Sequence, residues 1–145
     1  MSDSSTQELP IAHLLPKAPK TTLQNGIHII NFSSPHSFLF TDGSVLGKCD
    51  PARVEAGALD VEEIVSDGIK GTQDIEIKWH LNEKVIDMLD WEHRGPHADG
   101  VDIVLVPLPV ILAVKEAGYK VFPKIRACRI ANRMTKVIFA DKFCV

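Results

Sequence analysis

Seven basic residues gather in the last quarter of the chain and could together bind an anion. They are Lys120, Lys124, Arg126, Arg129, Arg133, Lys136 and Lys142. Guanidinium groups match the paired oxygens of phosphates and carboxylates. We expect Arg126, Arg129 and Arg133 to bind a small anionic ligand. The simpler alternative is that they pair with carboxylates of the same chain, because an arginine on an apolar strand face must find an anion.

Three further side chains complete this predicted ligand site. Trp79 and Phe122 carry rings that could stack on a base, and His36 is an additional polar contact. Near His36, the segment Ser33-Ser34-Pro35-His36-Ser37 places serine beside histidine, but the G-x-S-x-G turn of a serine nucleophile is absent. We expect Ser34 and His36 to stabilise a local turn through side-chain to backbone hydrogen bonds instead.

The loop from Glu92 to Asp102 contains residues that could bind a metal. His93, His97 and Asp99 offer imidazole and carboxylate donors. However, Gly95-Pro96 forbids the helix that would align two histidines four residues apart, so a solvated loop is the simpler interpretation. We expect no cofactor. A small metal-dependent hydrolase that uses this loop is a further, less favoured functional hypothesis.

The composition indicates a cytoplasmic globular protein. The chain has 145 residues, is 45% hydrophobic and has a formal charge of −3. Three widely spaced cysteines and an N-terminus without the features of a signal peptide predict reduced thiols. No apolar run reaches the roughly 18 residues of a membrane span.

Charge is distributed unevenly along the chain. Residues 1–116 contain 9 basic and 18 acidic residues, a charge of −9, whereas residues 117–145 contain 7 basic and 1 acidic, a charge of +6. The overall acidity and the single tyrosine argue against a nucleic-acid partner, because no aromatic residues alternate with the basic ones as in a stacking platform.

The central structural prediction is a βαβ unit over Val101 to Ile130. The run Ile103–Val106 is typical of a buried strand, Pro109 suits the start of a helix, and Gly118 suits its end. A second apolar run around 125–130 supplies the next parallel strand.

Other elements follow from local signals. We predict a strand at 27–32, a hairpin around Asp42-Gly43, and a helix that begins at Asp50-Pro51 and ends near Gly68. The alternating residues 74–81 predict a half-buried strand. Asn82 is expected to cap the next helix, and residues 125–140 to form a closing hairpin with its connection at 132–135.

Together these elements predict an α/β or α+β domain. It has a mixed sheet, an N-terminal β-hairpin, the central βαβ unit, a C-terminal hairpin and about three helices. Residues 1–26 are expected to be an extended, partly disordered arm, and residues 27–145 a single globular domain.

One segment resembles a pattern from small phage-encoded proteins. Those proteins open with Asn-Leu-Thr-Pro-His and continue with an apolar strand, a turn and an Ala-Arg-Val segment. The matching residues here are Asn31 to His36, Phe38, Asp42-Gly43 and Ala52-Arg53-Val54. Ser34 stands where the pattern has threonine, and one serine is inserted. The resemblance covers residues 27–54, implies no activity, and implies a phage or prophage origin; small phage proteins often inhibit or sequester components of host defence.

Two functional classes follow from these observations. The first is a non-catalytic binding protein, forming a homo-oligomer, that holds a small anionic or nucleotide-like ligand. The second is a protein–protein interaction or assembly module that docks on a host protein through the N-terminal arm and the basic C-terminal hairpin. Whether the chain is an enzyme stays open, and the absence of a recognisable catalytic constellation favours a non-catalytic role.

Overall fold

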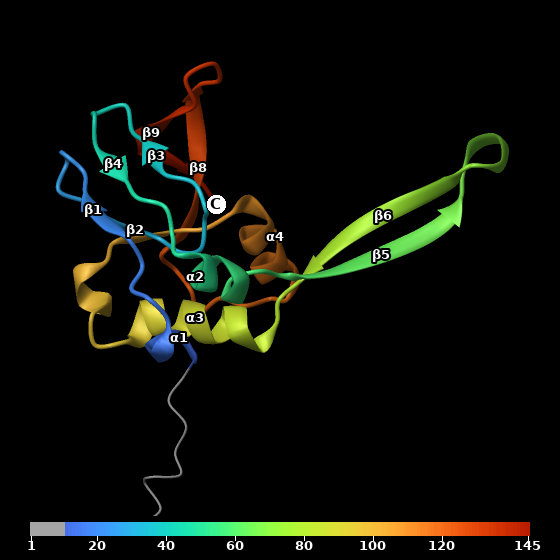
Figure 1. The fold of residues 1–145 in the computed structure, drawn as a ribbon, viewed down its shortest axis with the longest axis horizontal. Coiled ribbons are helices and arrows are strands. Elements are labelled where there is room, and N and C mark those ends of the chain that lie inside the picture. The colour runs from blue at the N-terminus through green and yellow to red at the C-terminus, as the bar shows by residue number, and fades with distance from the viewer. Residues whose placement is uncertain (1–10) are drawn as a thin grey trace, which may run out of the picture.

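The computed structural model describes residues 11–145 and consists of an α/β body from which one long hairpin projects (Figure 1). The described residues form four α-helices: α1 (Ile11–Leu14), α2 (Pro51–Ala56), α3 (Glu83–Arg94) and α4 (Leu108–Glu116). Two 3-10 segments are η2 (Ile69–Gly71) and η3 (Ala98–Gly100). The strands are β1 (Lys20–Thr22), β2 (His28–Asn31), β3 (Phe38–Leu39), β4 (Val45–Leu46), β5 (Asp60–Asp67), β6 (Gln73–His80), β7 (Ile103–Leu105), β8 (Ile125–Asn132) and β9 (Val137–Cys144).

The main sheet is mixed and has five strands in the order β1-β2-β7-β8-β9. The three central strands β2, β7 and β8 are parallel, and β1 and β9 pair antiparallel at the two ends. Since β7, α4 and β8 are consecutive, the predicted βαβ unit is confirmed. Pro107 precedes α4 and Gly118 follows it with a φ of +75°, as expected for a helix end that needs a left-handed residue. The predicted fold class is confirmed.

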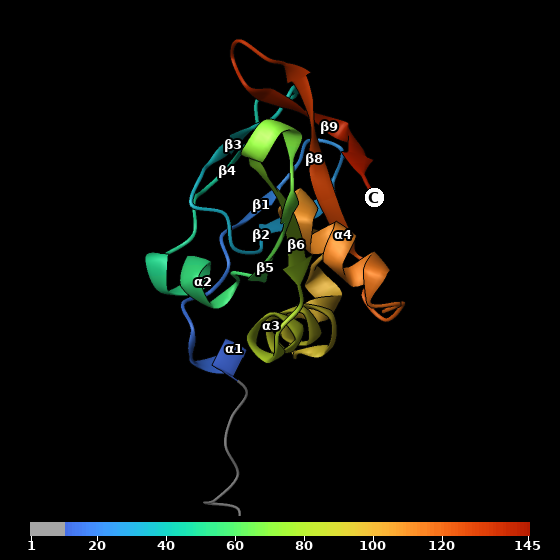
Figure 2. The ribbon, with the colours of Figure 1, turned by 90° about the vertical axis from the view of Figure 1, so that its right-hand side faces the viewer.

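The main sheet has two differently covered faces. On one face, Ile30, Val104 and Ile125 pack with Met88 and Leu89 of α3 and with residues of α4. On the other face, Ile29 and Leu105 pack against Phe40, Leu46, Ile138 and Ala140. Adjacent residues of one strand enter opposite clusters because side chains alternate across a sheet. Figures 1 and 2 show α3 below the sheet and the β3–β4 and β8–β9 hairpins on its upper side.

Two of the predicted hairpins are confirmed. β3 and β4 pair antiparallel around Asp42-Gly43, where Gly43 has a φ of +89° and Asp42 Oδ1 accepts a hydrogen bond from the Ser44 amide. β8 and β9 form the closing hairpin, with register shifts between Cys128 and Asn132.

The predicted helix from Asp50 to Gly68 is wrong in its second half. α2 begins as expected, with Asp50 capping the Ala52 amide, but it ends at Ala56. Residues 60–67 form strand β5, which pairs over its whole length with β6. The strand forms because Val61 pairs with Trp79 and Val65 with Ile75 of β6, and this cross-strand pairing outweighs local helix propensity.

The strand predicted at 74–81 is confirmed as β6, but it is not half-buried. Its apolar face is open: Ile75 is 54% exposed, Ile77 44% and Trp79 41%. The expected core residues Val61, Ile64 and Val65 are likewise exposed. β5 and β6 form a separate two-stranded sheet that extends away from the body (Figure 1), so only the base of this face, at Trp79, lies near α4.

The helix after Asn82 is confirmed as α3. Asn82 Oδ1 accepts the Val85 amide, and Val85, Met88 and Leu89 are buried. α3 runs to Arg94, so Glu92 and His93 belong to the helix rather than to the predicted loop. The loop itself begins at Gly95.

The N-terminal segment from residue 11 onward packs on the body rather than forming a free arm. Ala12 and Leu23 are buried, and β1 is an edge strand of the main sheet, because its amides and carbonyls pair with β2. The part of the predicted arm that comprises residues 1–10 lies outside the described residues.

Candidate functional site

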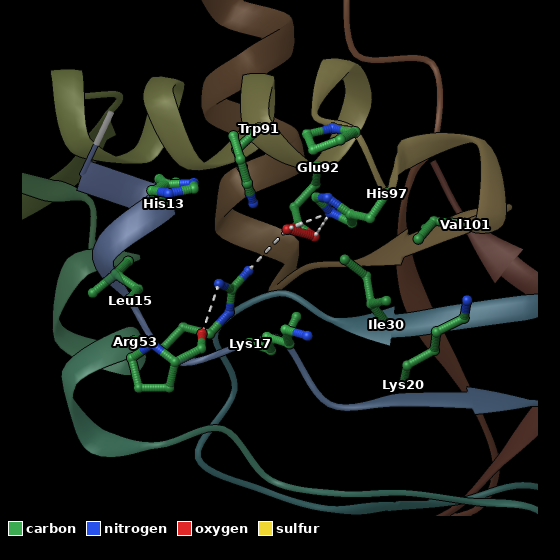
Figure 3. Close-up of a pocket in the computed structure, with 14 residues that line it drawn as sticks. His13, Leu15, Lys17, Lys20, Ile30, Arg53, Trp91, Glu92, His97 and Val101 are labelled. Atoms are coloured by element: carbon green, nitrogen blue, oxygen red, sulfur yellow. Dashed lines mark hydrogen bonds and ion pairs between the residues drawn. The ribbon is translucent and has the colours of Figure 1, made fainter. Parts of the chain in front are cut away.

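A cavity of about 550 Å³ lies between the N-terminal segment, α2, β2 and the end of α3. Figure 3 shows Arg53 and Glu92 pointing toward one another inside it, with Trp91 and His13 at the same end as Glu92. The lining residues come from five separate parts of the chain: Ala12, His13, Leu15, Pro16, Lys17, Ala18, Lys20, Ile30, Arg53, Trp91, Glu92, Pro96, His97 and Val101.

Asn31 forms hydrogen bonds with several backbone groups of the segments that follow β2. Its side chain is fully buried, and its amide lies 2.8 to 3.3 Å from the carbonyls of Ser34, His36 and Gly47. Its Oδ1 accepts from the Ser34 amide at 2.9 Å. The buried Asn31 thereby fixes the loop after β2, where the Ser34 carbonyl also accepts from the Cys49 amide at 2.9 Å.

Arg53 enters the core from the short helix α2. It is 2% exposed; its Nε donates to the Phe32 carbonyl at 2.7 Å, and its Nη1 lies 3.4 Å from the Pro16 carbonyl. Nη2 has no hydrogen-bond partner within residues 11–145, since Glu92 Oε1 is 3.6 Å away. Burial lowers the pKa of Arg53, and the nearby Glu92 carboxylate opposes that shift. The site therefore contains a buried guanidinium whose hydrogen-bonding capacity is not fully used.

Close backbone contact brings α2 to this position. A Cβ on Gly57, the residue that ends α2, would lie 2.3 Å from Ser33 Cβ. Only glycine allows that approach, because real Cβ contacts are never so short. The neighbouring Cys49 thiol is buried and hydrogen-bonds the Asn31 carbonyl at 3.1 Å, and burial raises the pKa of this thiol.

The last turn of α3 supplies Glu92, and the loop after it supplies His97. Glu92 is 2% exposed, and its two carboxylate oxygens lie 3.2 and 3.4 Å from His97 Nε2. Gly95 makes the turn between them: a Cβ there would lie 2.5 Å from the Trp91 carbonyl and 3.0 Å from the His97 ring. The glycine thus lets His97 fold back against Glu92.

Aromatic rings and lysines complete the walls. The Trp91 ring contacts His13 edge-on, with centroids 5.0 Å apart, and lies 5.5 Å from the His97 ring. Lys17 and Lys20 are exposed at the cavity mouth. With neutral histidines, three basic side chains and one carboxylate give the lining a formal charge of +2. This balance favours an anionic occupant.

The three predicted arginines do not converge. Arg126 donates through Nη1 to the carbonyls of Pro123 and Ile125, while Arg129 lies exposed in β8 and Arg133 exposed in the turn after it. Along a strand rising about 3.3 Å per residue, Arg126 and Arg133 are separated by roughly 20 Å. Among residues 11–145 the alternative of internal pairing is not seen either, since none of the three forms an ion pair with a carboxylate there.

The predicted aromatic and histidine contacts also lie apart. Trp79 is on the projecting hairpin, whereas Phe122 is 5% exposed and packed between Tyr119, His93 and Arg94, so its ring is not presented to a ligand. His36 is exposed, and its amide donates to Ser34 Oγ at 3.1 Å. That bond confirms the predicted local turn around Pro35.

The structure separates the candidate metal ligands. His93 Nδ1 donates to the Leu89 carbonyl at 2.7 Å and Nε2 accepts from the Lys124 amide at 3.1 Å, so both nitrogens are used. His97 faces Glu92, and Asp99 is exposed in η3. Within the part of the chain that the structure describes, no three donor side chains group around a point that could hold a metal ion.

Sequence reasoning missed Arg53, Trp91, Lys17 and Lys20 as site residues. One signal for Arg53 was present: it lies three residues before Ala56, and both occupy the buried face of α2. The segments that carry the phage-protein resemblance also meet here, through the bond from Arg53 Nε to the Phe32 carbonyl. No sequence signal links Lys17 to Trp91, because they are far apart in the chain.

Comparisons of the chain with protein-family models, with curated proteins and with solved structures find no match. In the described part of the chain, every helix is too short or too polar to cross a lipid bilayer.

Proposed function

We propose that this protein is a non-catalytic binding protein that holds a small anionic ligand in the Arg53 cavity. The observation that carries the proposal is Arg53 Nη2, a buried donor without a hydrogen-bond partner among residues 11–145, at the wall of a cavity with a net positive lining. An unsatisfied buried donor costs about 1–3 kcal/mol, and a ligand oxygen would recover that loss.

The lining favours a ligand with a flat apolar part as well as an anionic group. Trp91 offers a ring, and Leu15, Ile30 and Val101 offer apolar walls. Lys17 and Lys20 at the mouth would contact the anionic group. The volume of about 550 Å³ falls within the range of small-molecule sites. A nucleotide-like compound has this combination of groups.

A binding role fits the lining better than a covalent catalytic one. None of the lining residues is a serine, threonine or cysteine, so the described wall offers no hydroxyl or thiol nucleophile. Glu92 is engaged by Arg53 and His97.

The wider setting belongs to the same proposal. The free thiols of Cys49, Cys128 and Cys144 support a reducing, cytoplasmic location. The resemblance over residues 27–54 supports a phage or prophage origin, in which a homo-oligomer that sequesters a small anionic compound would act against host defence.

Calorimetry with AMP and with inorganic phosphate distinguishes binding in the Arg53 cavity from binding at the C-terminal arginines. We expect the double variant Lys17→Gln/Lys20→Gln to weaken AMP binding about tenfold or more, because it removes two cationic contacts. The matched variant Arg129→Gln/Arg133→Gln, with the same charge change at exposed positions, should bind as the native chain does.

If the arginine variant lost AMP binding and the lysine variant kept it, the ligand would bind at the C-terminal hairpin, and the cavity assignment would be wrong. Native mass spectrometry of protein purified from cells is the complementary measurement. A bare chain that also binds neither AMP nor phosphate would contradict the binding function itself.

A second candidate is a protein–protein assembly module that docks on a host protein. The exposed apolar face of β5 and β6 favours it. Capture of a host protein by the native chain, lost on mutation of that face, would support this function.

A further inference from the structure

The β5–β6 hairpin, residues 60–80 and here called the projecting hairpin, stands away from the rest of the molecule. Its two eight-residue strands pair from Asp60↔His80 at the base to Asp67↔Gln73 at the tip. Figure 1 shows both strands extending beyond the body, with only the base near α3 and α4. All of its residues except Gly68 and Lys78, which are partly buried, are exposed.

One face of the projecting hairpin is apolar. Residues directly opposite each other share a face, so Val61 lies beside Trp79 and Val65 beside Ile75, and between these pairs Ile77 lies opposite Glu63. The five apolar side chains are 41% to 54% exposed. The opposite face carries mostly charged residues, including the pair His80–Glu62 at 2.8 Å. An isolated two-stranded hairpin is only marginally stable in water, and such an apolar face indicates a contact surface.

The formal charges of the two hairpins indicate which surface the projecting hairpin contacts. The projecting hairpin has six acidic and two basic residues, a formal charge of −4. Two such hairpins placed face to face would therefore repel each other. The C-terminal hairpin, residues 125–144, has five basic residues and one acidic residue, a formal charge of +4. The two hairpins are thus complementary in sign and equal in magnitude.

Neither charged surface is neutralised within its own chain. Of the ion pairs in residues 11–145, the only one in either hairpin is His80–Glu62. The C-terminal hairpin also exposes apolar side chains beside its arginines: Ile130 is 50% exposed and Met134, in its turn, 95%. An apolar centre with a charged rim is the composition of a specific protein interface.

The surface area that would be buried favours a dimer in which each copy contributes one projecting hairpin. A two-stranded face eight residues long covers about 25 Å by 10 Å, or roughly 250 Å². One hairpin on one receiving surface would bury about 500 Å² in total, the size of an adventitious contact, whereas two reciprocal contacts bury about 1,000 Å², close to the lower limit of stable interfaces. A two-fold axis produces both contacts at once.

We infer that the protein forms a two-fold dimer in which the projecting hairpin of each copy packs its apolar face on the C-terminal hairpin of the other. Val65, Ile75 and Ile77 contact the neighbourhood of Ile130 and Met134, and the acidic rim faces Arg129 and Arg133. This interface lies outside the Arg53 cavity and does not depend on the function proposed for it.

Charge reversal tests the inference in the full-length protein. Variant one carries Glu63→Lys and Asp67→Lys, which share the apolar face of the projecting hairpin, and variant two carries Arg129→Glu and Arg133→Glu on the C-terminal hairpin. By sedimentation velocity, the native chain should be a dimer at about 50 µM, and each variant should dissociate at least about tenfold more readily. Mixed one to one, the variants should form a heterodimer, because both of its contacts again join opposite charges.

The controls make each outcome decisive. The double variant Glu55→Lys/Asp99→Lys, on exposed positions outside both hairpins, should dimerise as the native chain does. Circular dichroism reports whether the variants are folded. A monomeric native chain, or variants that remain dimeric, would overturn the inference. Failure of the mixture to reassociate would mean that the two hairpins do not contact each other, and that the apolar face serves a different partner.

Discussion

The Arg53 cavity and the projecting hairpin depart from ordinary side-chain burial in opposite directions. In the cavity, a guanidinium and a carboxylate are each 2% exposed, although charged groups are rarely buried. On the hairpin, Val65 and Ile75 are more than half exposed although they are strongly apolar. The remainder of the described chain follows the usual rule, with apolar clusters on both faces of the main sheet.

The difference shows how each region is stabilised. Arg53 tolerates burial because the Phe32 carbonyl and Glu92 satisfy part of its charge and hydrogen-bonding capacity, and the remaining capacity faces a cavity. The hairpin receives no such compensation from its own chain. The cavity is formed by residues of its own chain, whereas the apolar face of the hairpin has no comparable covering within residues 11–145. Four predictions test this contrast.

The largest effect is expected at Arg53. Arg53→Ala should lower the free energy of unfolding by about 3–5 kcal/mol, because it leaves Glu92 buried without its partner and opens a void. Urea denaturation measures this loss, with Lys84→Ala, at an exposed position outside both hairpins, as control. The double variant Arg53→Met/Glu92→Leu should regain much of it; a double variant as unstable as Arg53→Ala would mean that the ion pair is not the cause.

A smaller loss is expected at Gly57. Gly57→Ala should cost about 1–3 kcal/mol, since its Cβ would collide with Ser33 and push α2 away from the cavity. Gly47→Ala is the matched control, because its Cβ would meet Pro19 at 3.7 Å, an ordinary contact. Equal unfolding midpoints for the two variants would contradict the close approach seen here.

Acid should weaken the folded body through His93. Burial lowers the pKa of His93 in the folded state below its ordinary value of 6.5. The unfolded chain therefore takes up a proton first, so stability falls as the pH drops below about 6.5 toward the lowered pKa. His93→Gln, followed by denaturation between pH 4 and pH 8, should flatten this dependence; an unchanged slope would assign it to other groups.

The smallest effect is expected on the hairpin. Ile75→Ala should change the free energy of unfolding by less than about 0.5 kcal/mol at submicromolar concentration, because the side chain has few contacts within its own chain. Ile111→Ala, 2% exposed in α4, is the core counterpart and should cost about 2–5 kcal/mol. A large loss in the free energy of unfolding for Ile75→Ala in the dissociated chain would mean that this side chain is stabilised by its own chain, contrary to the contrast drawn between the two regions.

Local signals predicted much of the fold. The β7–α4–β8 unit, the Asp42-Gly43 turn, the Asn82 cap and the C-terminal hairpin each depend on residues within a few positions of one another. Residues 60–67 were predicted as helix because Val61, Ile64 and Val65 also fit helical spacing. Their pairing with residues 73–80 decided the strand, and that pairing is not encoded in the segment itself.

The residues of the candidate site were not predictable from the sequence. The sequence indicated an anion-binding protein from its clustered arginines, but strand geometry spreads Arg126 to Arg133 along β8. The gathered cationic groups come instead from Lys17, Lys20 and Arg53, which no spacing rule connects.

The sequence by itself determined the elements whose causes are local: apolar runs, helix caps and turn residues. The tertiary structure alone decided that Arg53 meets Glu92, that Trp91 and His97 close the same cavity, and that the apolar face of β6 stays uncovered. The physical reason is the range of the interactions. Caps and turns join neighbouring residues, whereas burial and charge pairing depend on contacts between segments that only the complete fold brings together.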